Sequence, residues 1–301
     1  MSRGSVVRLV MAVAGALVVA TAGSHAESPW APGWTSPYRD AATRVMKAAT
    51  ADDFAWQRLA ELTDTYGSRL SGSDNLARAI VWAQDTLKKD GLDNVHTEAL
   101  MVPHWVRGAE SAEIVEPARH PMAVLGLGGS TATGPGGVEA DVVAVDNFSD
   151  LRVHAADVRG RIVLFNQAFT NYADTVSART NSARAAAAVG AVAVLVRSIG
   201  PIGLRTAHTG SVTYQPDMPA IPAAAISGED ANRIARLLRR GRKVRVHLSL
   251  DGHYEPDAES ANVLAEITGR ERPDEVVLLG GHFDSWDVGT GASDDGVGCI
   301  V

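Results

Sequence analysis

Cysteine is almost absent from this sequence. Its 301 residues include only Cys299, so no disulfide can form within the chain and the fold must depend on its apolar core. Cys299 is surrounded by Val297, Ile300 and Val301. This setting predicts a small buried apolar side chain rather than a nucleophile.

The sequence also lacks an excess of basic charge. Its formal net charge is −7 at pH 7, and its Lys and Arg residues are scattered. We therefore expect no nucleic-acid partner, because binding to a phosphate backbone needs a clustered basic surface. The one short basic run, residues 239–243, is typical of the end of a helix.

Beyond the first 26 residues, no apolar run reaches the ~20 residues that are needed to cross a bilayer. The first 26 combine Arg3 and Arg8 with an apolar stretch over residues 9–22 and end in Ser24-His25-Ala26. This pattern is typical of a secretory signal that is cleaved after Ala26, with a retained membrane anchor as the alternative. We therefore expect a secreted or periplasmic protein that has no membrane partner after removal of the signal.

After this leader, apolar residues recur at helical spacing. Thr50 and Asp53 have the pattern of a capping box, ahead of a first helix that ends at Gly67. A second helix is expected over residues 74–90. A strand is then expected over residues 95–102.

Residues 117–252 differ from the preceding helical region in sequence pattern, because Gly, Pro and Asp separate short β-rich runs. We expect strands at residues 142–145, 161–166, 191–196 and 244–250, and helices at residues 177–189 and 229–239. The glycine-rich stretch 126–137 lacks the strand-turn-helix frame of a dinucleotide-binding motif, which favours a loop. The region is predicted to be a separate β-rich module that binds no metal.

Two further strands are expected after this module. The first covers residues 261–268, and the second covers residues 275–279, a near-continuous apolar run typical of a central strand buried on both faces. Functional residues of open α/β sheets cluster just beyond the carboxyl ends of such strands. His282 stands at this place, after two glycines.

His282 and Asp284 are two residues apart, so in an extended segment their side chains point to the same side. The Asp284 carboxylate can then accept the second ring N–H of His282, which fixes the tautomer and raises the basicity of the other nitrogen. Asp294 and Asp295 follow in a glycine-rich loop that can fold around a small ion. Similar loops bind calcium, and isolated HxD triplets occur by chance, but the combination favours metal ligation. Of the other histidines, only His208 is a candidate for contact with a substrate.

The stretches that carry a family resemblance extend over nearly the whole chain. Residues 67–73 (GSRLSGS), 103–108 (PHWVRG) and 281–298 resemble zinc peptidase family 28, a group of co-catalytic aminopeptidases and carboxypeptidases. Residues 158–163 and 221–226 are similar to a protease-associated domain.

The resemblance implies an α/β fold, in which a zinc-exopeptidase sheet of the phosphorylase/hydrolase-like type has helices on both faces and carries an inserted β-rich protease-associated domain. Residues 1–26 would be the signal peptide and residues 27–116 the first part of the peptidase domain. Residues 117–252 would be the insert, and residues 253–301 the start of the metal-binding core.

Roles follow from the resemblance at the matching positions. His282 is similar to the terminal ligand of one of two zinc ions, and Asp294 to the carboxylate that bridges both. Asp284 would be the orienting acid, and Asp295 would support the loop. The family also needs a downstream Glu-Glu pair, a further acid and a late histidine, which this chain lacks, so we expect an inactive fragment.

The function implied is that of an exported co-catalytic zinc exopeptidase that hydrolyses dipeptides or short peptides, with a homodimer as a candidate assembly. Two alternatives stay open. One is a non-catalytic receptor or binding protein on the same fold, and the other is a different zinc aminopeptidase or a cyclase.

Overall fold

The computed structural model describes residues 33–300, and the chain divides into two units. The first unit ends at Asp52, and its described part contains the 3-10 helix η1 (Gly33–Tyr38) and helix α1 (Arg39–Ala49). The second unit begins at Asp53 and contains all the elements that follow.

The signal expected at residues 1–26 lies outside the described residues. Across residues 33–300, no helix combines the length and the apolar character that crossing a bilayer requires. The expectation of export therefore stays a prediction.

The first predicted helix ends where expected, but it begins differently. Helix α2 (Phe54–Glu61) continues into the π-helical turn η2 (Leu62–Tyr66) and stops at Gly67, whose φ is 61°. The predicted capping box is wrong. Thr50 instead ends α1, and Asp53 makes no side-chain bond to the backbone at the start of α2. Its carboxylate accepts a bond from a glutamine side chain one turn later.

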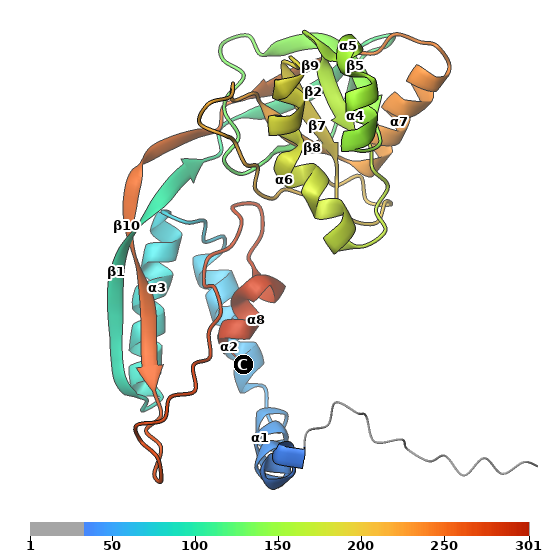
Figure 1. Ribbon diagram of the computed structural model, residues 1–301. Coiled ribbons are helices and arrows are strands. Elements are labelled where there is room, and N and C mark those ends of the chain that lie inside the picture. Colours follow the sequence, from blue (N-terminus) through green and yellow to red (C-terminus); the bar gives the residue numbers. More distant parts are fainter. Residues whose placement is uncertain (1–32, 301) are drawn as a thin grey trace, which may run out of the picture. The chain divides into compact units, whose positions relative to one another are not determined.

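The second predicted helix is confirmed as α3 (Asp74–Lys89), and the hydroxyl of Ser73 caps it by accepting a bond from Leu76 N at 3.2 Å. Helix α3 packs along an antiparallel ribbon of two strands, β1 (Asp93–Val106) and β10 (His253–Glu266) (Figure 1). Strand β1 contains the predicted segment 95–102 and extends beyond it, whereas β10 begins before the predicted segment 261–268 and ends two residues short of it.

The chain between β1 and β10 forms an eight-stranded mixed sheet in the order β3-β2-β9-β5-β6-β7-β8-β4. The strands β5 to β8 pair in parallel, and the others pair antiparallel. Their bounds are β2 (Glu110–Glu116), β3 (His120–Pro121), β4 (Val124–Gly126), β5 (Val138–Val145), β6 (Ile162–Phe165), β7 (Ala193–Arg197), β8 (Ala223–Ile226) and β9 (Arg245–Leu250). Because β2 precedes residue 117, the sheet includes residues that we had assigned to the preceding region. The domain boundaries themselves stay a prediction.

Helices cover both faces of this sheet (Figure 1), and the two faces have separate apolar cores. One core joins Ile162 and Leu164 of β6 to helix α7, and the other joins Val163 and Phe165 to helix α6. All four residues of β6 are fully buried, as expected for a parallel strand with helices on both sides. The helices are α4 (Phe148–Val153), α5 (Ala155–Val158), α6 (Tyr172–Ala188) and α7 (Gly228–Arg239). The basic run follows the end of α7, as predicted. We call β2 to β9 with these helices the sheet module.

The predicted central strand at residues 275–279 is wrong. This segment is irregular, and the side chains of Val276 to Leu279 are 85–87% exposed. A strand needs a neighbour to accept its backbone hydrogen bonds. Within the described residues, no strand pairs with this segment.

Candidate metal centre

His282 and Asp294 face each other in the second unit. His282 lies in an irregular segment, and Asp294 lies in the turn η3 (Ala292–Gly296). The distance between His282 Nε2 and Asp294 Oδ1 is 2.9 Å, and their side chains are 52% and 87% exposed. Two ligands of one tetrahedral zinc ion lie about 3.4 Å apart, so a small movement would let both atoms bind a single cation from solvent.

Asp284 faces the other nitrogen of the same ring. Its Oδ1 atom and its backbone oxygen lie 3.2 Å and 3.1 Å from His282 Nδ1. Partial burial disfavours the charged ring, but the hydrogen bond to Asp294 and the charge of Asp284 outweigh it and raise the pKa of His282. This arrangement is the one that the HxD spacing predicts for an orienting carboxylate.

Asp295 lies in different surroundings from Asp294. Its carboxylate oxygens occupy the space beside two glycines: a Cβ atom on Gly298 would lie 2.3 Å from Oδ1, and one on Gly281 would lie 2.6 Å from Oδ2. The two neighbouring carboxylates therefore point to different places. Their roles as bridging ligand and loop support stay predictions.

The prediction that Cys299 is buried is wrong. The residue is exposed in helix α8 (Val297–Ile300), and its Sγ atom donates a hydrogen bond to the backbone oxygen of His282 at 3.3 Å. Partial desolvation of the thiol by the surrounding protein, together with the nearby charge of Asp295, raises the pKa of Cys299. The apolar neighbours in sequence misled the prediction because a helix of one turn turns most of its surface to solvent.

Within residues 33–300, the hydrogen bonds of His208 join it to Ser198 and Ile199, not to His282 or Asp294. Its Nδ1 atom lies 2.6 Å from the backbone oxygen of Ile199, and its backbone N–H donates to Ser198 Oγ. In the described part of the chain, no hydrogen bond or ion pair joins His208 to His282 or Asp294. A role beside the substrate stays a prediction.

Sequence reasoning missed Arg69, which contacts the segment between the two candidate ligands. The side chain is fully buried, and it donates hydrogen bonds to the backbone oxygens of Gly67, Phe283 and Thr290 at 2.7 Å, 3.0 Å and 2.8 Å. The stretch GSRLSGS marked this arginine as part of a family pattern, but nothing in the sequence indicated which carbonyls it would reach.

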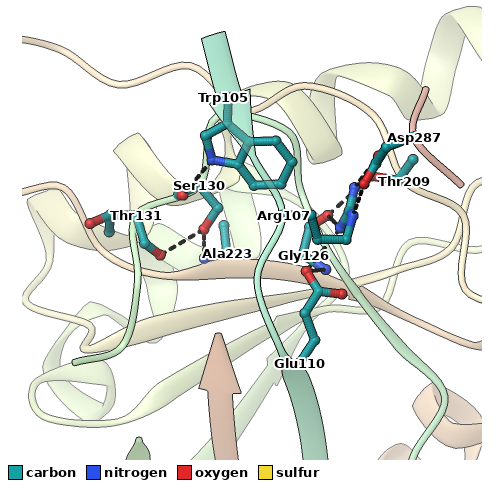
Figure 2. Close-up of polar contacts among 9 residues, drawn as sticks. All are labelled: Trp105, Arg107, Glu110, Gly126, Ser130, Thr131, Thr209, Ala223 and Asp287. Carbon is teal, nitrogen blue, oxygen red and sulfur yellow. Dashed lines mark hydrogen bonds and ion pairs between the residues drawn. The ribbon is translucent and has the colours of Figure 1, made fainter. Parts of the chain in front are cut away.

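Arg107 was also missed, and it connects the same segment with the sheet module (Figure 2). Its guanidinium forms two hydrogen bonds with Asp287, at 2.6 Å and 3.0 Å, and further bonds with Glu110 and with the backbone oxygen of Gly126. Burial disfavours the charge of this arginine, but the two carboxylates outweigh it and raise the pKa of Arg107. Thr209 completes the cluster by approaching the same guanidinium at 3.3 Å.

Trp286 provides a second connection to the sheet module. A Cβ atom on Gly128 would lie 2.1 Å from its ring, so only glycine leaves room for the indole there. A cavity of about 230 Å³ adjoins this region, lined by residues of the 68–75 segment, by the end of β1 and by Asp287. The segment between His282 and Asp294 thus contacts the sheet module through the ion pair of Asp287 with Arg107 and through the packing of Trp286 on Gly128.

The donor atoms fit one part of a zinc site. An imidazole nitrogen and a carboxylate oxygen are both usual zinc ligands, and the second ring nitrogen already has its carboxylate partner. Among the described residues, no group of three or more His, Cys, Asp or Glu side chains is placed to hold a metal ion. This chain therefore supplies two candidate ligands, and a complete site needs others.

Comparison with known protein families matches two regions of the chain. Residues 262–301, which contain both candidate ligands, match the model described as peptidase family M28, and residues 134–234 match the PA domain. The chain is related to peptidase family M28. The PA match lies within the sheet module, so the predicted combination of an α/β peptidase fold with a protease-associated domain is confirmed.

Relatives of known sequence and structure agree with this relation to M28. Carboxypeptidase Q of Mus musculus is 46% identical over 267 residues, which are 88% of this chain and 57% of that protein. The structure of a peptidase M28 precursor from Shewanella amazonensis is 38% identical, with a TM-score of 0.83, and the match covers 87% of this chain and 61% of that one. A zinc aminopeptidase of Bacillus subtilis is 20% identical with a TM-score of 0.59, over 82% of this chain and 55% of its own, and shows a likeness of fold alone. The chain thus spans little more than half the length of these relatives.

Proposed function

We propose that this chain is the amino-terminal part of an exported zinc exopeptidase that hydrolyses dipeptides or short peptides. The observation that carries the proposal is the trio formed by His282, Asp284 and Asp294, in which one ring lies between two carboxylates. The matches to M28 and to carboxypeptidase Q supply the reaction class. The leader with its small-residue end supports export.

Each residue of the trio has one task in this proposal. His282 would hold a cation through Nε2, Asp284 would hold the Nδ1 proton and the ring orientation, and Asp294 would supply the carboxylate proposed as the bridging ligand. Bound zinc would supply Lewis-acid chemistry, which activates a water molecule and polarises the scissile carbonyl. The general base and the remaining ligands would come from outside this chain, so the chain alone is proposed to be inactive.

Zinc content and hydrolysis in the protein extended to the length of its relatives test this proposal. Asp294→Ala and Asp294→Asn should each lose at least one zinc ion and nearly all turnover, because two dications would no longer share a negative charge. Asp295→Asn should keep two zinc ions and lose less activity. If Asp295→Asn loses metal while Asp294→Asn retains it, the assignment of the bridging carboxylate is wrong.

Substrate class is tested with the same protein. Dipeptides with free ends should be cleaved, and analogues with a blocked amino or carboxyl end separate an aminopeptidase from a carboxypeptidase. A full-length protein that binds no zinc and cleaves none of these peptides would instead support the non-catalytic binding protein.

A further inference from the structure

Arg69 contacts both ends of the segment that separates His282 from Asp294. Its Nε atom donates to Phe283 O at 3.0 Å, and its Nη1 atom donates to Thr290 O at 2.8 Å. The first carbonyl belongs to the residue directly after His282, and the second precedes Asp294 by four residues. One planar guanidinium therefore limits the distance between the two ends of this segment.

The main chain of Arg69 holds the middle of the same segment. Its N–H donates to Ser285 Oγ at 2.9 Å, and its carbonyl accepts from Ser285 N at 2.9 Å. Ser285 is only 5% exposed. Gly291 has a φ of 61°, and a Cβ atom there would lie 2.4 Å from Ser285 Cβ and 3.2 Å from Arg69 Nη2. The segment is thus packed directly on the arginine.

The burial of Arg69 argues against a role in stability alone. The side chain is 0% exposed, and all its hydrogen bonds go to backbone carbonyls, with no carboxylate among its partners in the described residues. Burial lowers the pKa of Arg69, and its Nη2 atom has no hydrogen-bond partner within residues 33–300. The charge of Asp284 partly offsets this effect on the pKa. A buried cation that is hydrogen-bonded only to neutral carbonyls is still costly, so a less polar residue would serve better if only packing mattered.

We propose that Arg69 is a positioning residue for the metal centre, which holds both ends of residues 283–290 so that His282 Nε2 and Asp294 Oδ1 can bind one cation together. The inference rests on the proposed function and deepens it. It gives the GSRLSGS stretch a part in metal binding that requires no ligand atom from that stretch.

The test uses the zinc-loaded full-length enzyme with Arg69→Met and Arg69→Lys. Arg179→Met is the matched control, because Arg179 is also buried, at 6% exposed, and lies in the sheet module. Like Arg69, it donates to a backbone oxygen, that of Thr209 at 2.9 Å, and it has one nitrogen without a partner among the described residues. Both variants to methionine therefore remove a buried guanidinium, but only one of them touches the metal segment.

Zinc affinity is measured by competition with a chelator, and the ligand geometry is followed by the absorption spectrum of the Co²⁺-substituted protein. Arg69→Met should weaken zinc binding about ten- to a hundredfold and alter the Co²⁺ spectrum, the range seen when groups that support metal ligands are removed. Arg69→Lys keeps the charge but cannot reach both Phe283 O and Thr290 O, so it should lose most of the same affinity. Arg179→Met should leave affinity and spectrum unchanged.

Two outcomes overturn the inference: wild-type zinc affinity in Arg69→Met, or an equal loss of affinity in Arg179→Met. If Arg69→Met does not fold, Arg69→Lys decides, and an unchanged affinity there also overturns it. A wild-type enzyme that binds no zinc would refute the proposed function instead. A wild-type enzyme that binds zinc while Arg69→Met binds it equally would refute only the positioning role.

Discussion

The sheet module and the segment before the metal centre contain similar apolar runs in opposite environments. The four residues of β6 are fully buried, whereas residues 276–279 are 85–87% exposed. Strand β6 pairs in parallel with β5 and β7, and each of its faces meets an apolar core. In the described residues, no strand pairs with 276–279. An apolar run therefore indicates where a strand can form, and its neighbours decide whether it forms.

The two regions also differ in what fixes their geometry. Apolar burial accounts for the sheet module. Residues 283–291 instead depend on Arg69, on the Arg107–Asp287 ion pair and on the contact of Trp286 with Gly128. The hydrogen bonds of Arg69 and the Arg107–Asp287 ion pair are directional. They therefore suit a segment that must place ligand atoms within tenths of an ångström.

Core truncation should give the largest difference between the two regions. Phe165→Ala removes a fully buried ring of the sheet module and should lower the free energy of unfolding by about 3–5 kcal/mol. Val277→Ala, at a side chain that is 87% exposed, should change it by less than about 0.5 kcal/mol. Denaturant unfolding followed by circular dichroism measures both. A comparable loss in Val277→Ala would show that this run is packed in solution.

The ion pair between the two regions should come next. Arg107→Gln leaves the partly buried Asp287 without its charged partner and should cost about 2–3 kcal/mol. Arg272→Gln is the control, because the Arg272–Glu275 pair has side chains that are 72% and 68% exposed and should contribute less than about 0.5 kcal/mol. A double-mutant cycle with Asp287→Asn should show coupling. If the losses of stability in Arg107→Gln and Asp287→Asn simply add, the two side chains do not interact in solution.

The glycine beneath Trp286 offers a steric test of the same connection. Gly128→Ala would place Cβ 2.1 Å from the Trp286 ring and should lower stability by about 1–3 kcal/mol while changing tryptophan fluorescence. Gly289→Ala is the control, because a Cβ atom there meets no heavy atom within 4 Å. If the two variants behave alike, Trp286 does not rest on the sheet module in solution.

Acid should weaken the sheet module through Asp230. Burial alone would raise the pKa of this carboxyl, but bonds from Ala123 N–H, Ser227 and His120, with the charge of Arg205, hold it below its usual value. Its stabilisation is therefore present above the unfolded pKa of about 3.9 and is lost as the pH falls through the lower folded value. Unfolding measured between about pH 5 and pH 2 should show a smaller dependence in Asp230→Asn than in the wild type. Parallel curves would contradict this account.

Local patterns predicted much of the fold. The helix at residues 74–89 was found because its apolar face, its serine cap and its final glycine agree. Strands β5, β6, β7 and β9 of the sheet module were found from short apolar runs between turn residues, whereas β2, β3, β4 and β8 were not predicted. The run at residues 275–279 and the thiol of Cys299 were predicted wrongly. Burial at both places depends on which distant parts of the chain pack against them, and the sequence pattern of one segment does not contain this information.

The site shows the same limit. The contact of His282 with Asp284 follows from a spacing of two residues, and the sequence contains it directly. Arg107 and Asp287 are 180 positions apart, and Arg69 reaches Phe283 across 214 positions. No periodicity or spacing links such residues, so only the folded chain could reveal that they support the metal segment.

The ribbon of β1 and β10 has a consequence for biosynthesis. The two strands pair over their length although roughly 150 residues separate them. At about 5–20 residues per second on the ribosome, β1 must wait on the order of 10 to 30 s for its partner to be synthesised. The sheet module, synthesised during that interval, can fold first and bring its two ends together. Strand β10 is then brought close to β1, and the segment that carries His282 is synthesised after Arg69, Arg107 and Gly128, the residues that contact it.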